Sequence, residues 1–160
     1  MKELKNEPRT LLVGIGNSGR SDDGLGWKFI EEIGNLGYDF LNCEFRYQLQ
    51  VEDALLVSEY DVVVFVDASQ EKLTHGFEMM SCIASDCYFF TTHAQMPGAI
   101  LFLTNRLYNK FPKAYTLAIS GNEWELDTSL STEAKHNLQA AVNFFVEEFL
   151  PTIQPALVSL

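Results

Sequence analysis

The sequence of 160 residues has little that would crosslink the chain, hold it in a membrane or bind nucleic acid. Its cysteines, Cys43, Cys82 and Cys87, are odd in number and form no C-x-x-C pair, which argues against a disulfide framework or a thiolate zinc site. Only 11 Lys and Arg accompany 22 Asp and Glu, and a net charge of −11 would repel nucleic-acid phosphates and anionic lipid. No apolar run approaches the roughly 20 residues of a membrane span.

What remains is typical of one compact cytoplasmic domain. The length is that of a single domain, and 47% apolar residues are enough for one core. The charged first residues are followed by no apolar run of the length that a signal peptide needs, so we expect none. We therefore predict one domain over 1–160 with loosely packed ends at 1–8 and 151–160. We expect it to be a monomer that binds neither nucleic acid nor membranes.

Short apolar runs alternate with segments of helical periodicity. The run Val62–Val66 is mostly β-branched and is typical of a strand covered on both faces. Strands are predicted at 10–15, 42–47, 62–66, 77–83 and 115–119. Helices are predicted at 25–36, 52–59, 99–107 and 131–150, the third preceded by Pro97 and Gly98 and the last capped by Ser131 and ended by Pro151. This alternation predicts a three-layer α/β/α fold, with an open, mostly parallel twisted sheet of about five strands and helices on both faces.

A glycine-rich loop follows the first predicted strand. The segment 14–19, Gly-Ile-Gly-Asn-Ser-Gly, matches the G-x-G-x-x-G fingerprint of dinucleotide-binding proteins. That fingerprint needs a helix to begin at the loop, whereas the helical pattern here begins near Leu25. Asp22 and Asp23 stand where the phosphates would bind. A nucleotide-binding oxidoreductase is therefore only a distant alternative, and a tight turn alone would explain the glycines.

Three polar features lie where predicted strands end. Asp22 and Asp23 follow the first strand, Asp67 directly follows Val62–Val66, and His93 lies in a loop ahead of a helix. Ligands of open parallel sheets bind beyond the carboxyl ends of the strands. Two carboxylates and an imidazole suit a borderline divalent ion such as zinc or nickel. The alternative is that these residues form no site: the acids would then be helix caps or solvated groups, and His93 a surface residue.

Together these motifs resemble the hydrogenase maturation proteases, which remove a C-terminal extension from the large subunit of nickel–iron hydrogenases. The resemblance rests on segments 12–17 (Leu-Val-Gly-Ile-Gly-Asn), 21–26 (Ser-Asp-Asp-Gly-Leu-Gly) and 66–68 (Val-Asp-Ala), on His93, and more weakly on 130–134. It implies that the catalytic, metal-coordinating residues are Asp23, Asp67 and His93. It also implies that the supporting loop contains Gly14, Gly16, Asn17, Asp22 and Gly24.

The resemblance implies an endopeptidase that acts on a hydrogenase large-subunit precursor after nickel insertion. The metal would be nickel recognised in the substrate, and zinc or another divalent ion could occupy the same site. The alternative is a non-catalytic maturation factor that binds the nickel-loaded precursor. The chain departs from the family at 47–51 (Tyr-Gln-Leu-Gln-Val, where a Gly-Gly-Thr-like segment is common), at 94–97 (Ala-Gln-Met-Pro), and at Asp23, commonly glutamate. These departures bear on substrate choice and activity and indicate a divergent member.

Overall fold

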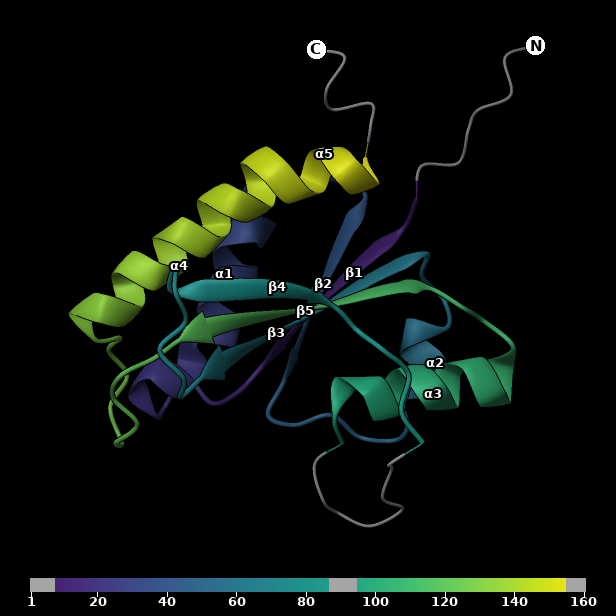
Figure 1. Cartoon of the computed structure of the whole chain (residues 1–160), viewed down its shortest axis with the longest axis horizontal. Coiled ribbons are helices and arrows are strands. Elements are labelled where there is room, and N and C mark those ends of the chain that lie inside the picture. Colours follow the sequence, from purple (N-terminus) through teal and green to yellow (C-terminus); the bar gives the residue numbers. More distant parts are fainter. Residues whose placement is uncertain (1–7, 87–94, 155–160) are drawn as a thin grey trace.

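The computed structural model describes residues 8–86 and 95–154, and its strands form one five-stranded sheet (Figure 1). The strand order is β2-β1-β3-β5-β4. Every neighbouring pair is parallel except β4 and β5, which are antiparallel. The bounds are β1 (Thr10–Ile15), β2 (Leu41–Arg46), β3 (Val62–Ser69), β4 (Phe77–Ser81) and β5 (Lys113–Ser120). The predicted open and mostly parallel sheet is confirmed.

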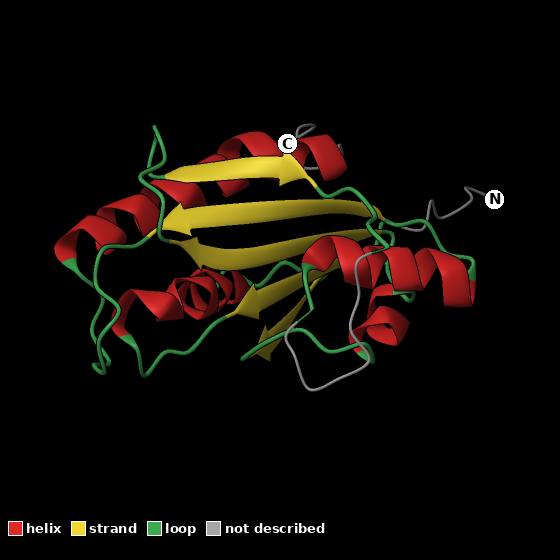
Figure 2. Cartoon of the chain, turned by 60° about the horizontal axis from the view of Figure 1, so that its bottom comes forward, coloured by secondary structure: helices red, strands yellow, loops and turns green. Residues whose placement is uncertain are grey.

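Helices cover both faces of the sheet, which gives the predicted three layers (Figure 2). One face is covered by α1 (Leu25–Gly34), α4 (Thr132–Phe144), the π-helical turn η2 (Phe145–Phe149) and α5 (Leu150–Ile153). The other face is covered by α2 (Asp53–Val57) and α3 (Pro97–Tyr108). A short 3₁₀ turn, η1 (Ser21–Gly24), joins the loop after β1 to α1. Among the described helices, none combines the length and apolar character that a bilayer crossing requires.

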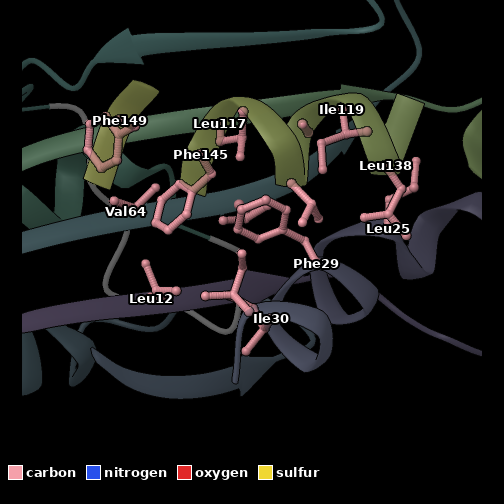
Figure 3. Packing of buried hydrophobic residues seen from close by; sticks show 14 of the residues in the cluster. Leu12, Leu25, Phe29, Ile30, Val64, Leu117, Ile119, Leu138, Phe145 and Phe149 are labelled. Carbon is pink, nitrogen blue, oxygen red and sulfur yellow. The ribbon is translucent and has the colours of Figure 1, made fainter. Parts of the chain in front are cut away.

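Each face of the sheet has its own hydrophobic core. Successive residues of β3 face opposite sides, so Val64 packs against α1 and α4 while Phe65 packs against α2 and α3. Because both faces of β3 are covered over Val62–Val66, this part of the strand is an unbroken apolar run. The larger core lies between the sheet and the helices α1, α4, η2 and α5. In it, the rings of Phe29 and Phe145 meet edge to face with centroids 5.2 Å apart (Figure 3). That contact joins α1 to the C-terminal helix.

The last helix continues past Pro151, where the sequence predicts its end. Proline lacks an N–H and its ring would clash with the carbonyl four residues earlier, here that of Glu147. The structure avoids the clash by widening the preceding turn, in which the N–H of Leu150 donates to the carbonyl of Phe145. Ile153 and Gln154 are buried. The chain is therefore packed as far as residue 154, instead of becoming loose from residue 151.

Gly26 lies where α1 comes closest to the sheet. A Cβ atom here would lie 2.5 Å from the carbonyl oxygen of Val66 and 2.6 Å from that of Ile15. Because both are backbone atoms, we expect Gly26→Ala to lower the free energy of unfolding by about 3 kcal/mol, as overpacking does at its upper end. Urea denaturation monitored by circular dichroism would measure the change.

Gly34, the last residue of α1, provides the matched control. A Cβ atom there would come no closer than 3.7 Å to any atom, the nearest being Cys43 Sγ. Gly34→Ala should leave stability unchanged or raise it by up to about 1 kcal/mol, because alanine favours the helix. Similar losses in both variants would contradict the close packing at Gly26.

Candidate functional site

The strand order places a topological switch point between β1 and β3. The chain leaves β1 towards α1 on one face and reaches β3 through α2 on the other. Ligands of open α/β sheets bind at such a point, outside the carboxyl ends of the strands. Asp67 lies here, because the β1–β3 ladder ends one residue earlier, at Gly14 and Val66. β3 itself continues to Ser69, three residues beyond its predicted end, because it still pairs with β5.

The loop between β1 and α1 brings Asp23 to the same edge of the sheet. Gly16 has a φ of 137°, and a Cβ there would overlap the carbonyl oxygen of Asp23. The N–H of Asn17 donates to that oxygen at 3.2 Å, and Asn17 Oδ1 accepts from the N–H of Gly19 at 2.8 Å. Gly24 packs on Ser18, where a Cβ would lie 2.9 Å from its Cα. These contacts close the loop on itself.

This packing does not fit a dinucleotide. The glycines allow close contacts inside the protein, and a Cβ at Gly14 would lie 2.7 Å from the carbonyl oxygen of Gly26 in α1. The helix begins at Leu25, and the acidic turn η1 precedes it. A pyrophosphate needs free N–H groups at a helix N-terminus next to the glycines. The physical basis for the nucleotide-binding alternative is therefore missing.

Asp23 and Asp67 are close enough to interact electrostatically. Loss of hydration raises the pKa of Asp67 to about 6, the hydrogen bond from the N–H of Ala68 (2.8 Å) opposes the rise, and the negative charge of Asp23 adds to it. Asp67 is nevertheless an exposed residue, so its carboxylate keeps contact with solvent while nearby protein atoms exclude part of its water. Two carboxylates placed in this way would both be stabilised by a cation between them.

The structure brings two of the three predicted metal ligands together. The third, His93, lies outside the described residues. Within 8–86 and 95–154, no group of three or more His, Cys, Asp and Glu side chains is arranged to hold a metal ion. Asp23 and Asp67 can supply negative charge and oxygen donors to a divalent cation, but they form an incomplete set of ligands.

Asp22, the neighbour of Asp23, is fully buried and points into the protein. Its Oδ2 accepts hydrogen bonds from Ser131 Oγ (2.6 Å) and from the N–H groups of Asn122 (2.7 Å) and Glu123 (2.8 Å). Its Oδ1 accepts from the N–H of Ser131 at 2.8 Å. Burial acts to raise the pKa of Asp22, but these four hydrogen bonds outweigh it and lower the pKa. The sequence suggested that Asp22 and Asp23 both face a ligand. In the structure only Asp23 is accessible to one.

Asp22 and Ser21 fasten the site loop to the segment that precedes α4. Ser21 donates its N–H to the carbonyl of Asp127 (2.7 Å) and its Oγ–H to that of Glu125 (2.9 Å). Ser131, besides donating to Asp22, accepts from the N–H of Ala134 at 3.2 Å, which confirms its predicted role as the N-cap. The position of Asp23 therefore depends on residues about one hundred positions later in the chain. The sequence signals near this contact were the predicted cap and the family resemblance of segments 21–26 and 130–134, and none of them indicated that the two segments meet.

The two segments that depart from the family pattern contact each other. The N–H of Gln95 donates to the carbonyl of Leu49 at 3.0 Å, and both residues are buried. Leu49 follows the carboxyl end of β2, and Gln95 lies two residues before α3. The departure at 47–51 and the described part of the second one, 95–97, are thus joined to each other.

The chain shares its fold with several solved structures. The hydrogenase maturating endopeptidase HybD from E. coli superposes with a TM-score of 0.71 over 90% of this chain and 93% of that chain, at 16% sequence identity. The fold is that of the hydrogenase maturation endopeptidases. The NiFe hydrogenase maturation proteases HycI and HybD from Thermococcus kodakarensis give TM-scores of 0.68 and 0.60. Their identities are 17% and 23%, and they cover 89% and 87% of this chain and 93% and 97% of their own.

No protein-family model and no curated protein matches the chain. The resemblance to maturation endopeptidases predicted from the motifs is thus confirmed at the level of the fold, and the low identities agree with a divergent member.

The bonds to Asp22 predict a large effect from a small substitution. In Asp22→Asn the amide group donates instead of accepting, so at least one buried donor loses its partner. We expect the free energy of unfolding at neutral pH to fall by about 2 kcal/mol. The exposed Asp39 gives the matched control, and Asp39→Asn should leave the urea midpoint unchanged.

The same hydrogen bonds predict a dependence of stability on pH. The folded pKa of Asp22 lies below its unfolded value of about 3.9, so the stabilisation is fully present above that pH. It is lost as the pH falls through the folded pKa. Thermal unfolding measured from neutral to acidic pH should therefore show a smaller acid-induced loss in Asp22→Asn than in the unchanged protein. Equal losses would show that another group causes the acid sensitivity.

Proposed function

We propose that this protein is an endopeptidase that removes the C-terminal extension of a nickel–iron hydrogenase large-subunit precursor after nickel insertion. The observation that supports this most is the proximity of Asp23 and Asp67 at the switch point of the sheet. The fold adds support, since three solved proteins that share it are named hydrogenase maturation endopeptidases or proteases.

In the proposed reaction the nickel belongs to the substrate. Asp23 and Asp67 would each offer a carboxylate oxygen to the ion, and His93 would offer a ring nitrogen. Such a mixed oxygen and nitrogen set suits nickel, and it would also accept zinc or another divalent cation. A cation would relieve the repulsion between the two carboxylates. Docking on the ion would place the scissile bond of the precursor beside the loop 16–24.

The proposal also covers the setting of the reaction. We infer a single domain over 1–160 that acts as a monomer on its precursor in the cytoplasm. The net charge of −11 supports a protein substrate over nucleic acid, because phosphates would be repelled. The proposed partner is the large-subunit precursor, in keeping with the names of the solved proteins that share the fold.

Neutral substitutions at the two carboxylates test the proposal. Asp67→Asn and Asp23→Asn keep the side-chain shape but remove a charge that the ion needs, so we expect processing to fall by more than about 100-fold. The Asp67→Asn variant should unfold at no lower a temperature than the unchanged protein, because the charged carboxylate of Asp67 is partly desolvated. Release of the extension from nickel-loaded precursor would be followed by mass spectrometry, with Glu32→Gln on the exposed side of α1 as the control.

His93→Ala should behave like the two carboxylate variants, and nickel-free precursor should not be cleaved by the unchanged protein. Full processing by Asp67→Asn, or cleavage of nickel-free precursor at the normal rate, would refute the proposed role of the ion. Tight binding of nickel-loaded precursor without cleavage would instead favour the non-catalytic maturation factor.

A further inference from the structure

The strand β4 forms one edge of the sheet, far from the switch point. In the described part of the chain β4 pairs with β5 alone, and β5 separates it from β3 and Asp67. Figure 1 shows β4 at the margin of the sheet, with the C-terminal helix running beside it. An edge strand offers unpaired backbone groups to another extended segment.

Alternate backbone groups of β4 point away from β5. The N–H of Cys82 donates to the carbonyl of Ala114 at 2.8 Å, which continues the β4–β5 register and puts Cys82 on the bonded side. Bonded and non-bonded positions alternate in an antiparallel ladder, so Met80 and Glu78 are also bonded to β5. The N–H and C=O groups that face the free edge are those of Phe77, Met79 and Ser81.

A groove of about 730 Å³ lies between β4 and the helix formed by α4 and η2. The rings of Phe77 and Phe144 lie in it with centroids 5.1 Å apart. Met79 and Ala140 complete the apolar part of the lining. Phe77, Met79 and Phe144 are only partly buried, although they pack on the larger core. The groove therefore presents apolar surface directly beside the unpaired strand edge.

The polar lining of the groove is acidic. It includes Glu78, Glu147 and Glu148, all exposed to solvent, together with His75 and Asn143. Of the described residues that line it, none is a lysine or arginine, and no ion pair joins the three glutamates to another described residue. Glu147 and Glu148 belong to the π-turn η2, a kind of turn that is rare and frequently found at functional sites.

We propose that this groove binds an extended basic segment of a partner protein, which adds to β4 as a further strand. Backbone hydrogen bonds would form with the outward groups of Phe77, Met79 and Ser81. Alternate apolar side chains of the segment would enter the groove, since successive side chains of a strand point to opposite faces. Its lysines or arginines would pair with the glutamates of the rim. The surface is separate from Asp23 and Asp67, so the inference goes beyond the proposed peptidase activity.

Synthetic peptides test the chemistry of the occupant. The probe is a fluorescent peptide of about eight residues, long enough to pair along a strand, in which valine alternates with lysine. The matched control peptide has glutamate in place of each lysine. We expect the anisotropy of the lysine peptide to rise with added protein, the binding to weaken with salt, and the glutamate peptide not to bind.

Two pairs of variants test the surface. Reversing the rim charge with Glu147→Lys and Glu148→Lys should weaken binding at least about tenfold, while Glu32→Lys on α1 should not change it. Ser81→Pro removes an N–H that faces the free edge and none that bonds β5, so it should also weaken binding, whereas Ser81→Ala should not. Thermal unfolding would confirm that each variant is folded.

Three outcomes would overturn the proposal. The first is that the lysine peptide does not bind, or binds no better than the glutamate peptide. The second is that its binding survives both the charge reversal and Ser81→Pro. The third is that the protein dimerises in size-exclusion chromatography and Ser81→Pro abolishes the dimer, because the edge would then be occupied by a second copy of the chain.

Discussion

The buried carboxylate of Asp22 is the constraint on which the rest of the site depends. A charge removed from water costs several kcal/mol unless polar groups replace the lost hydration. Here that replacement comes from Ser131, Asn122 and Glu123, all located between β5 and α4. The first loop can be folded only when this distant segment is also in place. The position of the site loop thus depends on the tertiary fold as well as on the local contacts that close the loop.

Two adjacent aspartates consequently have opposite roles. The energy of burying Asp22 is offset by its four hydrogen bonds, and the carboxylate fixes the turn η1. Asp23 is held by the same turn but stays partly exposed, beside a second carboxylate that raises the energy of both charges. A stable anchor next to an electrostatically unfavourable pair is typical of a functional site, where unfavourable local charge is supported by surrounding structure.

Most of the fold could be predicted because it depends on local patterns. The apolar run Val62–Val66 and the spacing of the helix residues are sufficient to define the layers. The sequence could not predict that Pro151 would be accommodated inside a helix, since this depends on the packing that holds Leu150 and Ile153. Asp23 and Asp67 could be identified from their positions after strands. Position alone did not distinguish Asp22 from Asp23, because the partners of Asp22 lie about one hundred residues away, and only the family resemblance separated the two.

The hydrogen bond between Leu49 and Gln95 restricts how segments of this fold can be exchanged between relatives. The two residues lie far apart in the sequence, yet both are buried where they meet. Because the bond joins two backbone groups, it survives a change of side chain but not a change in the path of either segment, which would leave a buried donor or acceptor without its partner. A folded chimaera can therefore exchange the side chains of one segment alone, provided that the length and backbone path of both segments are kept.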